Sequence, residues 1–286
     1  MPTTYAHWRF GDECISTMPE NLKNIVNKYR DLYNIGVHGP DFFFYELKDS
    51  SVAKYGSKMH YVASMDFFAS TKDAIKNNPD KYEPMMAYVL GFLSHFTFDT
   101  TAHGYVERKK EVSNVTHNKI EAEYDRHVME MEGLTPHKVD RAATLHPTKF
   151  NASIIALFFP FDTDVIHRAI KSQRICLKGL NAPSKAKHKF LVNTLTKLKK
   201  FDYIDLIIDA EEYTPCKDAD IRIDKLRNKA LGAYPALLDS LINYYENDVP
   251  LIDFFNHTFC EWPDYKDIPV LDYESELNYI VEPYLF

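Results

Sequence analysis

The sequence predicts an all-α fold, and two observations support this prediction. Apolar residues recur with a helical period almost throughout the chain, whereas segments that alternate as a strand would are few. Only 9 glycines occur in 286 residues, which together with the missing alternation leaves little room for a sheet. With 45% hydrophobic residues the chain can bury a sizeable core. We therefore expect one multi-helix domain over residues 1–286.

The order of the helices follows from start and stop signals. Pro19 favours a first helical position and Gly36 is a typical stop, so the first helix is predicted from Pro19 to about Tyr33. The segment from Gly36 to Asp41 contains two glycines and a proline and is predicted to be a loop. Further helices are expected at about 41–48, 57–76, 82–107, 117–132, 146–158, 162–180, 184–200 and 219–247, with a shorter one near 250–258.

The candidate site residues all lie in the first half of the chain, residues 1–130. Residues 131–286 contain no comparable cluster of ligand-type side chains, so they are expected to complete the helical bundle and to wall the site. The acidic, aromatic tail at 267–286 either lies across the body or contacts a partner.

Five residues of metal-ligating types lie at helical spacing between positions 95 and 121. His95, Asp99 and His103 are each four residues apart, and His117 and Glu121 repeat this spacing. Residues four apart share one face of a helix, so the first three form a ladder of imidazole, carboxylate and imidazole. At about 1.5 Å rise per residue, His95 and His103 lie roughly 12 Å apart along the axis, too far to share one ion. The ladder by itself implies at least two metal ions.

The ladder lies in a largely apolar stretch from Ala87 to Asp99, which predicts that its side chains face inward. Buried polar groups need partners. A lone histidine on such a face is more often a satisfied core residue, but three groups on one stripe followed by a second pair favour metal binding. Imidazole and carboxylate without thiolate suit zinc in a hydrolytic site, and a carboxylate can bridge two cations.

Three further ligand-type residues stand upstream of the ladder. They are His7, Asp41 directly after a Gly-Pro turn, and His60 near the start of a predicted helix. Each is weak alone, because an aspartate after proline is also a common helix N-cap and a single histidine is more often a solvated or core residue. The polar residues after Glu121 are expected on the solvated face of their helix: Glu123, Asp125 and His127.

Taken in chain order, eight positions resemble the zinc-dependent phospholipase C family and, more distantly, the zinc-dependent single-strand nucleases that share its fold: His7, Asp41, His60, His95, Asp99, His103, His117 and Glu121. The resemblance covers about residues 5–125. The segments from Tyr5 to Gly11 and from Gly39 to Tyr45 are also similar to signal-free bacterial members of that family. The resemblance implies an all-helical domain that carries two or three zinc ions.

The resemblance also implies how the ligands divide among the ions. Asp99 would lie at one zinc with three further ligands: Asp41, His60 and His95. It would bridge to a second zinc that takes His7. The remaining zinc would be held by the last three ligands: His103, His117 and Glu121. The step from Asp99 to His103 is shorter than in the secreted relatives, so the ion that His103 joins stays open.

The secreted relatives also use the amine and carbonyl of an N-terminal tryptophan as ligands. No tryptophan precedes His7 in this chain. Our hypothesis is that removal of Met1 ahead of Pro2 exposes a terminus five residues before His7 that reaches the same zinc.

The predicted function is that of a zinc-dependent phosphoesterase of the phospholipase C type. A zinc cluster binds a phosphodiester through its oxygens and generates hydroxide from water at neutral pH. Asp41 is the candidate catalytic residue, as a ligand that also orients or deprotonates the attacking water. A non-catalytic metal-binding protein, whose ion would be saturated by protein ligands, and a nuclease remain alternatives. A net charge of −7 disfavours a nucleic-acid partner.

The remaining features of the sequence concern the location and the partners of the protein. Neither a secretory signal nor a membrane-spanning run is visible, so a cytoplasmic location is expected. The four cysteines are scattered singly, which argues against a thiolate zinc site. The expected partner is a phosphoester, phospholipid included. The basic amphipathic segment 184–200 is either a solvated helix flank or a peripheral contact with an anionic membrane.

Overall fold

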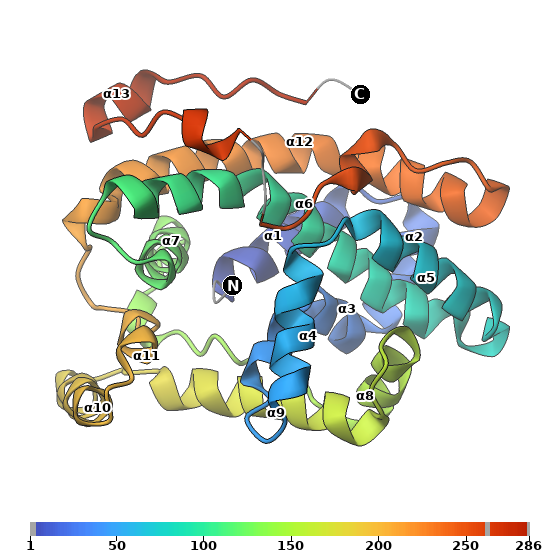
Figure 1. The fold of residues 1–286 in the computed structure, drawn as a ribbon, viewed down its shortest axis with the longest axis horizontal. Helices are drawn as coiled ribbons and strands as arrows, with labels where there is room; N and C mark the ends of the chain where they lie inside the picture. The colour runs from blue at the N-terminus through green and yellow to red at the C-terminus, as the bar shows by residue number, and fades with distance from the viewer. Residues whose placement is uncertain (1–3, 261–263, 285–286) are drawn as a thin grey trace.

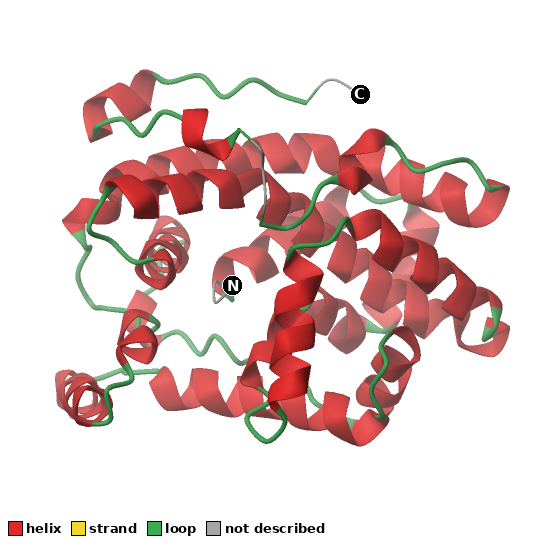
Figure 2. Cartoon of the chain, viewed as in Figure 1, coloured by secondary structure: helices red, strands yellow, loops and turns green. Residues whose placement is uncertain are grey.

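A computed structural model describes residues 4–260 and 264–284 of the protein. Within these ranges every regular element is a helix, and Figure 2 shows helices joined by loops without a strand. The predicted all-α fold is confirmed. None of the helices in these ranges has both the length and the apolar character that are needed to cross a bilayer.

Two long helices form the framework of the fold. Helix α6 (Tyr82–Val112) and helix α12 (Lys217–Asn247) each have 31 residues and pack against one another (Figure 1). From Pro84 to Val106 every residue of α6 is buried, because neighbouring helices cover α6 on all sides. A helix that is apolar all round belongs in a core, so polar side chains on α6 must find their partners inside the protein.

Short helices enclose this framework in chain order. The N-terminal side of the fold is built by α1 (Tyr5–Thr17), α2 (Glu20–Lys28), α3 (Arg30–Gly36), the 3₁₀ turn η1 (Asp41–Tyr45), α4 (Ser50–His60) and α5 (Ser64–Lys76). The remaining helices are α7 (His117–Met131), α8 (Lys149–Ile155), α9 (Thr163–Leu180), α10 (Lys185–Lys197), α11 (Phe201–Asp205) and α13 (Tyr273–Asn278). Short 3₁₀ turns connect several of them: η2 (Pro79–Lys81), η3 (Pro136–Lys138), η4 (Ala156–Phe158), η5 (Thr214–Cys216), η6 (Asp253–Asn256) and η7 (Tyr265–Asp267).

Helix α1 was missing from the sequence prediction. Its first turn is held by a distant residue, because the carboxylate of Asp125 in α7 accepts hydrogen bonds from the backbone N–H groups of Thr4 (3.1 Å) and Ala6 (2.8 Å). The free N–H groups of a helix start are normally satisfied by a nearby cap. A cap that lies 119 residues away in sequence leaves no local signal.

Two predicted helices are each divided in two, and both divisions affect the site region. The helix predicted from Pro19 to Tyr33 breaks at Tyr29, between α2 and α3. The helix predicted at 57–76 breaks after His60, which is therefore the last residue of α4 and not near the start of a helix. The new start at Ser64 is fixed by long-range bonds, since its N–H and hydroxyl donate to the carbonyls of His257 and Phe255.

Helices α3 and α6 approach each other through two glycines. A Cβ atom on Gly36 would lie 2.3 Å from the carbonyl oxygen of Tyr88, and one on Gly91 would lie 2.2 Å from that of Tyr33. Such distances exclude any larger residue without a shift of the backbone. The contact therefore sets the position of the loop after Gly36, and this loop leads directly to Asp41.

Up to residue 284 the C-terminal segment lies along α12 (Figure 1), as one of the two alternatives for the tail predicts. The buried carboxylate of Glu276 accepts two hydrogen bonds from Arg222 of α12, at 2.8 and 2.9 Å. Lys225 donates to the carbonyls of Leu277 and Tyr279. A bidentate arginine–carboxylate pair is both strong and directional, so it anchors the segment against the body.

Candidate metal centre

The ladder predicted on α6 is present and buried. His95, Asp99 and His103 are exposed by 0, 1 and 3% of their surface, so all three face the interior. Their i, i+4 spacing places them along one side of the helix. Along this side of the helix, the three side chains meet residues from distant parts of the chain.

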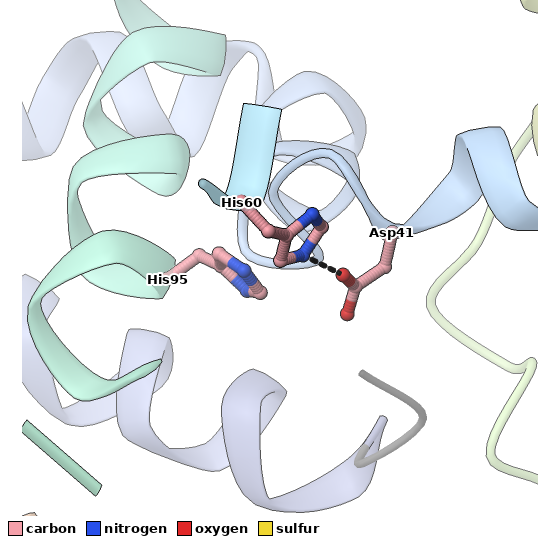
Figure 3. Close-up of side chains that lie close together, drawn as sticks. All are labelled: Asp41, His60 and His95. Carbon is pink, nitrogen blue, oxygen red and sulfur yellow. Dashed lines mark hydrogen bonds and ion pairs between the residues drawn. The ribbon is translucent and has the colours of Figure 1, made fainter. Parts of the chain in front are cut away.

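The first group joins His95 to two residues from far upstream. Asp41, at the start of η1, and His60, at the end of α4, offer ligand atoms that lie with those of His95 within 4.8 Å of one another. Figure 3 shows the two imidazole rings and the carboxylate turned toward a common space. The Nε2 atom of His60 is 3.0 Å from Oδ1 of Asp41, and its Nδ1 is 2.7 Å from the carbonyl oxygen of Gly56.

A glycine makes room for His95 in this group. Gly39 has a φ of +51°, and a Cβ atom placed on it would lie 2.1 Å from Cδ2 of His95. Both the left-handed backbone conformation and the contact with the ring favour glycine. The loop from Gly36 to Asp41 therefore packs directly on the imidazole that it helps to position.

The second group joins His103 to the start of α7. The ligand atoms of His103, His117 and Glu121 also lie within 4.8 Å of one another. His117 lies between two carboxylates, with Nε2 at 2.9 Å from Oε1 of Glu121 and Nδ1 at 2.6 Å from Oε1 of Glu107. Helix α7 begins at His117 because Thr116 accepts a hydrogen bond from the N–H of Lys119 as its N-cap.

Asp99 and His7 lie between the two groups. The carboxylate oxygens of Asp99 are 3.7 Å from Nε2 of His7, 4.0 Å from Nε2 of His95 and 3.8 Å from Nδ1 of His103. These distances are too long for hydrogen bonds. The ring of His7 stacks on that of His95 with centroids 4.4 Å apart. All eight predicted ligand residues are thus brought into one continuous cluster.

Several buried polar atoms of this cluster have no hydrogen-bond partner. They are both ring nitrogens of His7, both ring nitrogens of His95, both oxygens of Asp99 and one oxygen of Glu121. Burying such an atom without a partner costs about 1–3 kcal/mol, and more for a charged one. A cavity of about 20 Å³ lies between His7, Asp99 and Glu121, which is enough for one water-sized occupant.

Electrostatics keep the imidazole of His95 neutral and the carboxylate of Asp99 charged. Burial, with the nearby His7 ring, lowers the pKa of His95 to about 3. Burial alone would raise the pKa of Asp99, but the surrounding imidazoles of His103, His7 and His95 hold it well below its usual value. Neutral imidazole and ionised carboxylate are the forms that bind metal.

The histidine His117 of the second group has a raised pKa, in contrast to His95 of the first group. Burial would lower the pKa of His117, but Glu121 and Glu107 together raise it to about 9. The hydrogen bond from His117 lowers the pKa of Glu107 to about 2. In this group a positive charge is already favoured between the two carboxylates.

A pocket of about 500 Å³ opens beside the cluster. Its walls come from η1, α4, α6, α7 and α11 and include His60, His103 and His117 together with Glu107 and Asp202. Asp41, His95 and Asp99 do not line it. The pocket therefore gives access to the second group and to one residue of the first.

Two residues of the site were missed by the sequence prediction. Glu107 continues the ladder by another four residues after His103, and this spacing could have identified it. Cys260 lines the pocket with Sγ 4.0 Å from Nδ1 of His103, and its N–H donates to the carbonyl of His60. No pattern around Cys260 could have revealed this contact, because it comes from the half that lacks a ligand-type cluster.

One expectation near the site was wrong and another lies outside the described residues. Glu123 and Asp125 were expected on a solvated face of α7, but they are only 1 and 0% exposed. They are buried because α1 and α12 cover this side of α7. The proposed role of the N-terminal amine involves residues 1–3, which lie outside the described ranges.

The fold and the paired ligand groups define a class of all-α proteins with a buried site suited to metal. The family model for zinc dependent phospholipase C matches residues 6–168, more than half of the chain. The chain belongs to this family. No curated protein and no solved structure matched the chain.

Proposed function

We propose that this protein is a zinc-dependent hydrolase that cleaves a phosphodiester of the phospholipase C type with a metal-activated water. The observation that carries the proposal is the position of Asp99, an ionised, buried carboxylate that lies among three imidazoles without a hydrogen bond to any of them. This arrangement is unfavourable by itself and becomes favourable with cations between the ligands.

The hydrogen bonding of His60 supports a cation in the first group. A carbonyl oxygen only accepts, so Nδ1 of His60 must donate its proton to Gly56. In the neutral ring, Nε2 then points a lone pair at the carboxylate of Asp41, 3.0 Å away. A backbone carbonyl on one ring nitrogen commonly fixes the other as a metal ligand. Zinc between Nε2 and Asp41 would remove the repulsion.

The separation of the ligands supports two or three ions. We assign the first zinc to Asp99 and three partners: Asp41, His60 and His95. We assign the last zinc to the second group: His103, His117 and Glu121. His7 and Asp99 line the small cavity, where a further ion would be held. Asp99 then bridges two ions, as carboxylates can.

Bound zinc would supply Lewis acidity to the phosphoester and would lower the pKa of a water to near neutrality. The protein residues then have separate tasks. Neutral His95 would offer a ring lone pair to zinc, and ionised Asp99 would offer a negative charge. Glu107 accepts the Nδ1 proton of His117 and orients that ring. The carbonyl of Gly56 orients His60 by accepting its Nδ1 proton. The role of Asp41 as the base for the attacking water stays a prediction, because Asp41 does not line the pocket.

The pocket favours a small phosphodiester over a nucleic acid. Glu107 and Asp202 add negative charge to its walls, whereas nucleic-acid grooves are positively charged. Its volume of about 500 Å³ is in the range of small-molecule sites. A phospholipid headgroup with its phosphate is of this size class.

The proposal is tested by metal analysis of the purified protein together with turnover of four substrates. The panel contains a phosphatidylcholine, a bis-aryl phosphodiester, a phosphomonoester and single-stranded nucleic acid. We expect zinc in the protein, hydrolysis of the two phosphodiesters, loss of activity with a chelator and recovery with added zinc. Zinc without turnover of any substrate would instead indicate a non-catalytic metal-binding protein, and preferred cleavage of nucleic acid would indicate a nuclease.

A further inference from the structure

One surface segment has a charge opposite to that of the whole protein. Residues 184–201 contain six lysines and no aspartate or glutamate, although the chain carries a net charge of −7. The lysines are Lys185, Lys187, Lys189, Lys197, Lys199 and Lys200. Among the described residues, none of the six forms an ion pair with a carboxylate. We call residues 184–201 the basic segment.

Most of the basic segment is the helix α10, which has no buried residue. Its inner side contributes Leu191 and Leu195 to a small hydrophobic cluster that is separate from the main core. Phe190 lies on the opposite side of the helix and is 66% exposed. Two more apolar residues lie just beyond the C-terminal end of α10: Leu198 is 63% exposed and Phe201 is 58% exposed. Large apolar side chains thus alternate with lysines on the outer surface.

A carboxylate on the inner side of α10 already has two basic partners. Asp209 accepts hydrogen bonds from His188 of α10 and from Lys119 of α7, both at 2.7 Å. Neither of these partners is one of the six lysines of the basic segment. An exposed surface of interleaved lysine and aromatic residues is typical of proteins that rest in the interface of an anionic bilayer.

The basic segment adjoins the pocket. Phe201 is the first residue of α11, and the next two residues, Asp202 and Tyr203, line the pocket wall. Hydrogen bonds from Thr116 to Asp205 and from Asn118 to Asp202 hold α11 against the start of α7, which bears His117.

Exposed apolar residues also stand across the pocket from α11. Phe44 and Tyr61 line its other wall and are 39 and 55% exposed, and nearby Leu47 is 79% exposed. The pocket therefore has an apolar residue at its edge on both sides. In Figure 1, α10 and α11 lie at the lower left, with α4 in the foreground across from them.

We propose that the basic segment docks the protein on the surface of an anionic phospholipid bilayer, with the pocket facing the headgroups. This inference rests on the proposed function, since docking here serves a phosphodiester that is itself a lipid. The lysines would attract the anionic surface, while Phe190, Leu198 and Phe201 would enter the headgroup region. A nucleic acid fits less well, because the adjoining pocket is lined by Glu107 and Asp202.

The test is co-sedimentation with vesicles of phosphatidylcholine, with and without phosphatidylglycerol, at low and high salt. The charge variant is Lys189→Gln/Lys197→Gln, and the apolar variant is Phe190→Ser/Leu198→Ser. The control is Lys23→Gln/Lys76→Gln, on α2 and α5 at the other end of the molecule (Figure 1). Hydrolysis of the soluble bis-aryl phosphodiester is measured for every variant.

We expect the wild type to bind the anionic vesicles and to be released by salt. Each lysine removed should weaken the partition about fivefold, so the charge variant should lose about 25-fold. The apolar variant should lose about tenfold or more. The control should bind as the wild type does, and all variants should keep their soluble activity.

Equal vesicle binding by the wild type and the charge variant would overturn the proposal. So would binding of the basic segment to single-stranded nucleic acid in preference to vesicles. Lysine-dependent vesicle binding by a protein that hydrolyses no phosphodiester at all would support docking while refuting the proposed function, so the two failures are distinguishable.

Discussion

The two ligand groups of the site are built in different ways. In the first group, the side chains of Asp41 and His60 are 3% exposed and that of His95 is fully buried. In the second group, the side chain of His117 is 17% exposed and its partner Glu107 is 27% exposed. The first group is held by packing, because Gly39 and the stacked ring of His7 enclose His95. The second is held by charge, because carboxylates lie on both sides of His117.

This difference separates two requirements of a hydrolytic metal site. A buried group that includes an unpartnered ring, here His95, would hold an ion in one geometry, because that ring has no alternative partner. A group at a pocket wall can exchange water and substrate at an open position. Each of the following changes should therefore affect one group more than the other. The exception is the first change, which concerns Asp99 between the groups.

The largest effect is expected for Asp99→Asn, which removes the carboxylate that lies between the two groups. Zinc content should fall, and hydrolysis should drop by on the order of 10³-fold, since metal ions contribute several kcal/mol of transition-state stabilisation. Metal analysis, turnover of the bis-aryl phosphodiester and circular dichroism measure the change. Asp73→Asn, at an exposed position of α5, is the control for charge. Unchanged zinc content in Asp99→Asn would refute the bridging assignment.

Gly39→Ala should damage the first group selectively. The left-handed backbone costs alanine about 1–2 kcal/mol, and the contact of its Cβ with the His95 ring adds about 1–3 kcal/mol. Gly133→Ala is a matched control, because Gly133 also has a positive φ of 73° but no atom lies within 4 Å of its Cβ. Chemical denaturation and zinc content should show a larger loss at Gly39. Equal losses would mean that only the backbone conformation matters.

Asp220→Asn tests how α7, which bears two ligands of the second group, is held on α12. Burial raises the pKa of Asp220 to about 7, and Glu123, Arg126, His127 and Asp224 surround it. In the folded protein Asp220 keeps its proton up to about pH 7, whereas in the unfolded chain its carboxyl group loses the proton near the ordinary pKa of 3.8. Its contribution to stability is therefore present at low pH and is lost as the pH rises between these values, by up to about 4 kcal/mol.

Urea denaturation from pH 4 to pH 8 measures this effect. The asparagine variant should lose the pH-dependent part of the free energy of unfolding, so it should gain stability relative to the wild type as the pH rises. Parallel pH profiles for the two proteins would contradict the prediction.

Glu107→Gln should weaken the second group alone. A carboxylate that accepts the second N–H of a ligand histidine is typically worth about 10–100-fold in metal affinity. One zinc should become easier to remove by a competing chelator, while the zinc of the first group is retained. Glu111→Gln, one turn further on α6, is the control, because Glu111 lies outside the pocket. Equal chelator sensitivity in both variants would refute the positioning role of Glu107.

The extent to which the site could be predicted depends on sequence separation. Residues on one helix reveal their proximity through spacing, which is why the ladder on α6 and the pair on α7 were found, and Glu107 could have been. His60 was found as a ligand type, but its helix was placed wrongly because the break after it is stabilised by Phe255 and His257, almost two hundred residues away. Cys260 had no local signal at all.

By itself, the sequence determined the helical class, the inward face of α6 and the chemical nature of the ligands, because periodicity and residue type act locally. Only the tertiary structure decided that His7, Asp41 and His60 meet this face. That meeting depends on the close contact of α3 with α6 at Gly36 and Gly91 and on the capping of α1 by Asp125. Such contacts are formed between distant segments, and their free energy appears only when the chain is packed.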